Sequence, residues 1–300
     1  MEYCSVKETA AKWKISERAV RKYCSEGRVP GAFLTGKTWN VPENAEKPVR
    51  RKRKDARPAT LLDILREEKK ARVSGGLYHR LQIDMTYNSN HMEGSRLTHE
   101  QTRYIYETRT IASNGNPVRL DDVLETVNHF RCIDEVLDHA DHQLSEAYIL
   151  KLHQILKTNT SDAQKEWFAV GTWKKLPNEV GGRPTAAPEQ VPEAIKALLA
   201  AYNKNPRKTL DDILDFHVQF ERIHPFQDGN GRVGRLIMLG ECLRNDMVPF
   251  IITEELKFYY YRGLAEWDRE PGYLRDTCLT AQDYFKKVLK FFRTKLKSDF

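Results

Sequence analysis

Twelve consecutive residues concentrate the side chains of this chain that could bind phosphate and move a proton. They run from 224 to 235 and read H-P-F-Q-D-G-N-G-R-V-G-R. The imidazole of His224 has an ordinary pKa near neutrality, so it could accept a proton from an attacking hydroxyl group. Asp228 alone would be a turn residue, but beside phosphates its carboxylate is a candidate ligand for Mg²⁺. The combination predicts a site that holds a triphosphate and moves a proton beside it.

The second half of the stretch supplies groups that bind anions. Gly229, Asn230 and Gly231 could form no more than an Asn-Gly turn. If a helix follows them, the glycines let backbone N–H groups approach an anion, and the helix N-terminus adds a favourable field. Arg232 and Arg235 are three residues apart, so on such a helix they share a face within reach of the β- and γ-phosphates. Taken alone, two arginines on a helix would more often face solvent.

The residues before the stretch are expected to place His224 at the end of a helix. An apolar helical run ends in Phe220 and Ile223. Pro225 disfavours helical backbone at the residue that precedes it, so His224 is expected on a loop. Phe226 is the expected hydrophobic anchor that packs this loop down.

The twelve residues match the motif of Fic-domain proteins, H-x-F-x-[D/E]-G-N-G-R-x-x-R, at every fixed position. The chain therefore resembles the Fic family, and the likeness covers roughly residues 75 to 290. It implies a mostly α fold, with a helical Fic core and a β-hairpin flap. The segment 173–191 is rich in proline and glycine, which excludes a long helix and favours a hairpin or an extended loop.

Two further segments resemble the nucleotide site of the family. One is the flap, whose residues are expected at the ATP: Val180, Gly181, Gly182 and Arg183. The other is the sequence Y-Y-R-G-L, which begins at Tyr260 and resembles a family element near the adenine. Both sets are therefore expected to contribute to ATP binding.

The resemblance also implies an activity. It is the transfer of AMP from ATP to a Tyr, Thr or Ser hydroxyl of a target protein and of the protein itself, with release of pyrophosphate. His224 would deprotonate the hydroxyl, and Mg²⁺ on Asp228 would bridge the α- and β-phosphates. The backbone of residues 229–231 would stabilise the charge that builds in the transition state. Relatives with lysine at the second glycine bind the nucleotide reversed and move phosphate, whereas Gly231 favours AMP transfer.

A second pattern predicts that the chain inhibits itself. Residues 89–94 read S-N-H-M-E-G and fit the inhibitory pattern of Fic proteins, [S/T]-x-x-x-E-[G/N]. Ser89 and Glu93 are four residues apart, so they lie on one face of a helix, expected over about 78–93. If Glu93 pairs with Arg235, that arginine is unavailable to the γ-phosphate of ATP. An ordinary surface helix is the alternative.

Residues 1–49 are expected to form a small domain of their own. A capping-box pattern opens one helix at Ser5, and Ser16 can cap a second helix that ends at Cys24. Residues 33–42 then predict two short strands around a turn, a wing. The segment resembles the winged helix-turn-helix domains of the excisionase/MerR-like group, through V-K-E-T-A-A-K-W-K-I-S-E-R-A-V-R-K-Y-C-S-E-G-R-V-P-G-A and the later W-N-V-P.

The basic character of the chain lies in this N-terminal part. Residues 1–60 contain 15 Lys and Arg against 7 Asp and Glu, whereas the remainder contains 34 against 35. Such asymmetry suggests a nucleic-acid-binding module joined to a neutral one. Arg18, Arg21 and Lys22 would project from the second helix, where basic side chains could meet the phosphates of DNA. A domain that binds a protein or pairs subunits is the alternative.

The remaining residues divide into two parts. Residues 50–72 are expected to form a basic linker and a connecting helix, and residues 73–300 the Fic domain with its inhibitory helix. No apolar run approaches the ~18 residues that span a bilayer, and the N-terminus lacks an apolar signal region, so a cytoplasmic protein without a membrane partner is expected. Five scattered cysteines without a C-x-x-C predict reduced thiols rather than disulfides or a zinc site.

Three functions stay open on these grounds. The first is a self-inhibited enzyme that transfers AMP, with ATP and Mg²⁺ as its substrate and cofactor. The second is a DNA-binding transcription regulator that uses the Fic domain as a nucleotide sensor, and the third is an enzyme that removes AMP from modified proteins. A homodimer is expected, because many helix-turn-helix proteins and Fic proteins of this subgroup pair.

Overall fold

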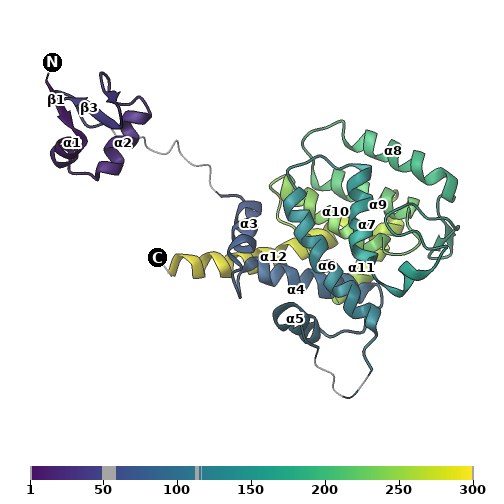
Figure 1. Ribbon diagram of the computed structural model, residues 1–300. Coiled ribbons are helices and arrows are strands. Elements are labelled where there is room, and N and C mark those ends of the chain that lie inside the picture. Colours follow the sequence, from purple (N-terminus) through teal and green to yellow (C-terminus); the bar gives the residue numbers. More distant parts are fainter. Residues whose placement is uncertain (1, 49–58, 112–114, 116, 299–300) are drawn as a thin grey trace. The chain divides into compact units, whose positions relative to one another are not determined.

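The computed structural model describes residues 2–48, 59–111, 115 and 117–298 (Figure 1). The chain divides into two compact units, Met1–Pro58 and Ala59–Phe300. The basic run expected at residues 50–54 lies outside the described residues. Each unit has its own hydrophobic core, so each is described by itself.

The first unit has two helices and a three-stranded antiparallel sheet. Its elements are β1 (Tyr3–Ser5), α1 (Val6–Trp13), α2 (Glu17–Ser25), β2 (Phe33–Thr35) and β3 (Thr38–Pro42), and the sheet order is β1-β3-β2. Ser5 and Glu8 form the predicted capping box, and the Ser16 hydroxyl accepts from Ala19 N–H. Val20 and Val41 are fully buried between the helices and the sheet. The two predicted helices and the two short strands around a turn are thus present, and β1 is additional.

The second unit is almost entirely helical, as expected. Its long helices are α3 (Leu61–Ala71), α4 (Leu77–Met92), α5 (His99–Thr108), α6 (Leu120–His139), α7 (Glu146–Lys157), α8 (Val191–Tyr202), α9 (Leu210–Ile223), α10 (Asn230–Arg244), α11 (Glu254–Glu266) and α12 (Gly272–Ser298). Two 3₁₀ turns, η1 (Ser161–Gln164) and η2 (Pro188–Gln190), flank the region between α7 and α8.

Helix α10 is the centre of this unit. It contacts α4, α6, α7 and α9 (Figure 1). Leu236 packs into the larger core cluster, while Met238 packs into the cluster formed with α9, α11 and α12. Because α10 is buried on all sides, its sequence shows no single apolar stripe that would predict it. The same packing fixes the position of its N-terminus. That N-terminus carries the twelve-residue stretch.

Helix α3 belongs to the helical unit rather than to a free linker. Thr60 caps it through a capping box with Asp63. Leu62 and Leu65 are buried in the large core cluster, where α3 contacts α4 and α6. The connecting helix expected within residues 50–72 is therefore part of the folded unit that begins at Ala59.

The region between α7 and α8 forms the predicted β-hairpin. Strand β4 (Glu179–Val180) pairs antiparallel with β5 (Arg183–Pro184), with Val180 opposite Arg183. Gly181 and Gly182 make the turn, and both strands are exposed. The hairpin is thus a short exposed element on a helical scaffold.

Two further expectations concern the whole chain. Among the described residues, no helix combines the length and apolar character needed to cross a membrane. All five cysteines are free thiols in this structure, and four of them are buried.

Candidate active site

His224 ends helix α9, as Pro225 required. It occupies the left-handed region at φ 50°, and its N–H donates to the Phe220 carbonyl at 2.9 Å. Its Nδ1 lies 3.2 Å from the backbone oxygen of Glu221. A proton on Nδ1 would donate to that oxygen. In this tautomer Nε2 is the basic nitrogen. Burial lowers the pKa of His224 below its ordinary value of 6.5, so the ring is neutral at pH 7.

The loop after His224 is locked by Asn230. The Oδ1 of Asn230 accepts from Phe226 N–H at 2.8 Å, and its Nδ2 donates to the Phe226 carbonyl at 2.8 Å. Phe226 is fully buried and stacks on His153 with ring centroids 3.9 Å apart, which confirms the expected anchor. The side chain of Asn230 therefore holds the loop, and only its backbone N–H can face a ligand.

Gly229 and Gly231 shape the N-terminus of α10. Gly229 is the N-cap at φ 86°, a backbone conformation that disfavours other residues. At Gly231 a Cβ would overlap Oε1 of Glu93 and lie 2.8 Å from Nη1 of Arg235. The first N–H groups of the helix have no partner within the helix and can bind an anion. The carboxylate of Glu93 thus lies over the turn where an anionic ligand would bind.

Arg235 makes the contact predicted with the inhibitory pattern. Its Nη2 forms an ion pair with Oε1 of Glu93 at 2.6 Å and donates to the Ser89 carbonyl at 3.0 Å. Its Nε donates to the Ser89 hydroxyl at 3.0 Å. Arg235 is 4% exposed, and Glu93 is the C-cap of α4. Ser89 and Glu93 therefore hold this guanidinium at the end of α4, and it also bonds the Tyr260 hydroxyl on α11.

Arg232 and Arg235 have different partners. Its guanidinium binds a carboxylate oxygen of Glu125 on α6 and, at 3.0 Å, Oδ2 of Asp228. It is 3% exposed. The two arginines were expected to reach phosphate side by side, but in this structure Arg232 is engaged by the carboxylates around Asp228.

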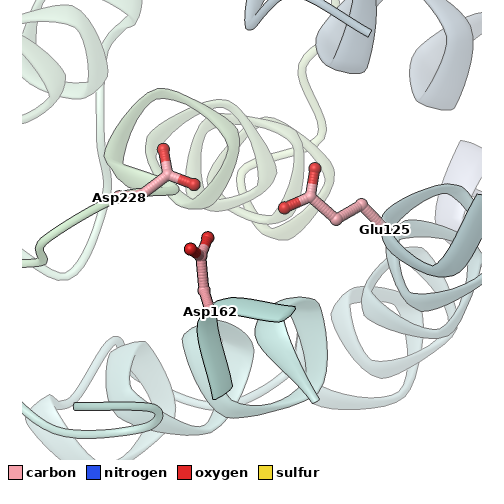
Figure 2. Close-up of side chains that lie close together, drawn as sticks. All are labelled: Glu125, Asp162 and Asp228. Carbon is pink, nitrogen blue, oxygen red and sulfur yellow. The ribbon is translucent and has the colours of Figure 1, made fainter. Parts of the chain in front are cut away.

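Three carboxylates converge below the loop, from α6, η1 and the stretch itself. Glu125, Asp162 and Asp228 each place an oxygen within 4.8 Å of the others (Figure 2). The ammonium group of Lys157 contacts all three, at 2.7 Å for Asp162 and for Oδ2 of Asp228 and at 2.5 Å for Glu125. Burial alone would raise the pKa of Asp228, but Arg232 and Lys157 hold it well below its usual range.

Asp228 is suited to a hard divalent cation. It is ionised, its side chain is 46% exposed, and both cationic neighbours contact Oδ2, which leaves Oδ1 outside both ion pairs. Mg²⁺ prefers one or two carboxylates and keeps several waters or phosphate oxygens. The residues present therefore fit the predicted magnesium site at Asp228.

Part of this arrangement matches a known protein family. Residues 143–240, which hold α7 to α10 with the hairpin, match the Fic/DOC family. This segment is a Fic domain. Its sequence relatives include protein adenylyltransferase fic-1 of Caenorhabditis briggsae, 27% identical over 187 residues, which are 59% of this chain and 35% of that protein. A probable protein adenylyltransferase of Aquifex aeolicus is 30% identical over 150 residues, which are 45% of this chain and 43% of that protein.

The solved structures agree with the fold around the Fic domain. A Fic-domain-containing signalling protein from Bacteroides thetaiotaomicron is 26% identical with a TM-score of 0.57, and the match covers 78% of this chain and 90% of that one. Fic-1 from Caenorhabditis elegans has a TM-score of 0.59 at 19% identity over 77% of this chain and 72% of that one, a likeness of fold. The chain spans less than half the length of the curated relatives just named.

The hairpin of the Fic domain is fixed to the loop that follows His224. Lys174 N–H donates to the Pro225 carbonyl at 2.8 Å, and the side chain of Asn178 donates to the Phe226 carbonyl at 2.9 Å. Lys174 Nζ also bonds the Asn178 side chain at 2.6 Å. The hairpin base is therefore held beside the site, while its tip residues, 180–183, are exposed.

Tyr260, on α11, is not at the surface of the second unit. It is 1% exposed, and its hydroxyl bonds Nε2 of the buried His217 at 2.5 Å. Tyr261 beside it is 42% exposed. Tyr260, which was predicted to contact the adenine, thus places its phenol in the core beneath the site, while the neighbouring ring of Tyr261 faces outward.

Glu221 is a site residue that sequence reasoning missed. It lies one helical turn before His224, and its Oε2 is 3.8 Å from Nδ1 of that histidine. Burial raises the pKa of Glu221 to about 8, with Arg235 lowering it and Glu93 raising it further. Its Oε1 has no hydrogen-bond partner among the described residues. The only signal in the sequence is an acid three residues before the histidine.

Proposed function

We propose that this protein transfers AMP from ATP to a hydroxyl side chain, Tyr, Thr or Ser, of a target protein and of itself. The observation that carries the proposal is the geometry at the start of α10. A neutral, partly buried imidazole on His224 adjoins a helix N-terminus that can bind phosphates. The names of the sequence relatives, protein adenylyltransferases, support the same reaction.

In the proposed reaction, Nε2 of His224 accepts the proton of the attacking hydroxyl. The oxygen forms a bond with the α-phosphorus of ATP, the bond from that phosphorus to the α,β-bridging oxygen breaks, and pyrophosphate leaves. The first N–H groups of α10 face the charge that builds on the phosphate oxygens. Asn230 holds the loop in this position through Phe226. A Mg²⁺ ion on Asp228 would neutralise phosphate charge.

The hairpin supplies a surface for the target chain. Strands β4 and β5 are two residues long and exposed, so each presents a free backbone edge. An extended target segment can add to such an edge through main-chain hydrogen bonds. The ties from Lys174 and Asn178 to the loop would then place the target hydroxyl beside His224.

The proposed resting state is inhibited by Glu93. Its carboxylate lies over the first turn of α10 and pairs with Arg235. The γ-phosphate of ATP would need the same arginine, and two anions cannot share that position without strong repulsion. ATP therefore cannot settle in the reactive pose until the end of α4 moves away.

The position of the label distinguishes AMP transfer from other ATP chemistry. With Glu93→Gly protein and Mg²⁺, ATP labelled at the α-phosphorus should label the protein, and ATP labelled at the γ-phosphorus should not. Intact-mass spectrometry should show the added mass of AMP, and EDTA should prevent it. Label from the γ-phosphate alone would contradict the proposal, and release of AMP from a pre-modified protein would favour the reverse reaction.

A second proposal concerns the N-terminal unit, which we infer is a winged helix-turn-helix module that binds DNA. Arg18, Arg21 and Lys22 are exposed on α2, although Arg21 also pairs with Glu17 and Lys22 lies 3.8 Å from a carboxylate oxygen of Glu26. Their placement suits contact with backbone phosphates. The same module could pair two chains, and the five free thiols suit the reducing cytoplasm.

Salt dependence tests the DNA proposal. Fluorescence anisotropy of the full chain with its own upstream DNA should show affinity that falls steeply between 50 and 200 mM salt, since counterions are released on binding. Replacing Arg18, Arg21 and Lys22 by alanine should weaken binding about tenfold or more and lower the salt slope. Lys7→Ala, an exposed change on α1, is the matched control. Equal binding by the triple variant would sink this assignment.

A further inference from the structure

Lys157 is a buried lysine whose charge has a specific set of partners. It is the last residue of α7 and is 1% exposed. An ammonium group has three N–H donors, and here three carboxylates surround it, those of Glu125, Asp162 and Asp228. A lysine is almost never fully buried unless it is paired in this way. Its position is therefore built by the fold.

The three partners come from separate parts of the Fic-containing unit. Glu125 lies on α6, Asp162 on the turn η1, and Asp228 on the loop before α10 (Figure 2). Three carboxylates that meet within a few ångströms are the donors that a hard divalent cation prefers. The ammonium of Lys157 lies where their oxygens converge. A cation is thus already present in the form of a side chain.

The balance of charged side chains in the cluster shows what Lys157 contributes. Arg232 contacts Glu125 and Asp228, and the half-exposed Lys165 contacts Asp162 at 2.6 Å, so with Lys157 the three carboxylates have three cationic neighbours. Without Lys157, Arg232 and Lys165 would remain at the edges of the cluster, and no cation would lie where the three carboxylates converge, so their mutual repulsion would rise. A divalent cation from solvent would relieve that repulsion.

We propose that Lys157 acts as a resident cation: it closes the three-carboxylate cluster to divalent metal ions and positions Asp228 for the single metal that arrives with the nucleotide. The positioning half of this proposal depends on the proposed function, because it concerns the metal of AMP transfer. Lys157 binds Oδ2 of Asp228 and thereby leaves Oδ1 for that ion. Lys157 is accordingly a positioning residue, since it acts through Asp228.

Nucleotide-free Mn²⁺ binding tests the proposal. Lys157→Met keeps the length of the side chain and removes its charge. Electron paramagnetic resonance of Mn²⁺ without ATP should show one new site per chain in this variant, with affinity at least about tenfold above the wild type. Lys151→Met is the matched control, because Lys151 is on the same helix, is half exposed, and pairs at 2.7 Å with Glu135, which is outside the three-carboxylate cluster. The control should bind Mn²⁺ as the wild type does.

A second substitution shows whether the gained Mn²⁺ site is the three-carboxylate cluster. Asp162→Asn added to Lys157→Met should remove most of the gained Mn²⁺ affinity, because one of the three ligands loses its charge. If Lys157→Met does not fold alone, Mn²⁺ should restore a cooperative melting transition. No gain over Lys151→Met, or no rescue of an unfolded variant, would overturn the proposal.

The outcomes also separate this inference from the proposed function. The Mn²⁺ measurement uses no nucleotide and no turnover, so absent AMP transfer by Glu93→Gly protein would leave it intact. In the Glu93→Gly background, Lys157→Met should raise the Mg²⁺ concentration needed for half-maximal labelling by about tenfold, because Asp228 loses its orienting partner. An unchanged Mg²⁺ requirement would contradict the role of Lys157 in positioning Asp228. It would leave intact the proposal that Lys157 closes the cluster to metal ions.

Discussion

Replacing Glu93 by glycine is expected to raise self-labelling with AMP by about 100-fold or more. The reason is the occupancy of Arg235, whose Nη2 is held by Glu93 at 2.6 Å. Hydrogen bonds from a charged group contribute about 1.5–3 kcal/mol each, so two bonds from Arg235 to the γ-phosphate would correspond to at least two decades of affinity. Repulsion between Glu93 and the triphosphate would be lost in addition.

The same change should destabilise the free protein. Arg235 is 4% exposed and would lose its ionic partner, keeping its contacts to the uncharged Ser89 and Tyr260. Breaking a fully buried ion pair costs about 3–5 kcal/mol, and Glu93 is 26% exposed, so the expected loss is smaller. ATP would supply the missing anion. Thermal melting should therefore show a lower midpoint for Glu93→Gly alone and a larger rise with ATP than in the wild type.

Three variants show whether Glu93 inhibits through its charge or through the space that its side chain occupies. Glu93→Gln keeps the volume and removes the charge, so it should give an intermediate rate. Ser89→Ala removes one contact to Arg235 but leaves the carboxylate, so it should raise labelling only a few-fold. Binding of a non-hydrolysable ATP analogue to Glu93→Gly with His224→Ala measures affinity without turnover. If its affinity equals that of His224→Ala alone, Glu93 does not inhibit by blocking ATP.

The local features of this fold were predictable because their causes are local. The capping box at Ser5, the helix end at His224 and the hairpin turn at Gly181 each depend on a few neighbouring residues. The contact of Glu93 with Arg235 was predicted from a resemblance rather than from physics, since 142 residues separate them.

The rest depended on partners that sequence spacing does not reveal. Arg232 was expected at phosphate, but Glu125, which is 107 residues away, engages it. Tyr260 was expected at the adenine, yet packing of α11 against the core buries its ring. The strand β1 has three residues, too few to show an alternation of its own. In each case the deciding term is a tertiary contact that only the packed structure defines.

Replacing His224 by alanine in the Glu93→Gly background is expected to lower labelling by about 1,000-fold. General base catalysis contributes about 10²–10⁴ in rate, and His224 is the group at the site whose Nε2 is free to accept a proton. ATP affinity should stay within about threefold, because phosphate binding belongs to α10. His142→Ala, an exposed change, is the matched control and should label at the rate of its parent.

The pH dependence of labelling shows whether His224 acts as a base. Burial lowers its pKa below 6.5, so the imidazole stays neutral and able to accept a proton at every pH above that value. Glu221, the acid nearest to its Nδ1, has its pKa raised to about 8, so it is protonated at pH 7 and adds no charge that would raise the pKa of His224. The rate should therefore be constant from pH 6.5 to 7.5 and fall only at more acid pH.

The residual activity of His224→Ala provides the decisive comparison. If His224 supplies the base, the acid limb of the profile belongs to its imidazole, and the alanine variant should lose that limb along with most of the rate. A histidine that only supports the loop would lower the rate without changing the pH at which it falls. Such a result would assign the proton transfer to another group, although AMP transfer itself would stand.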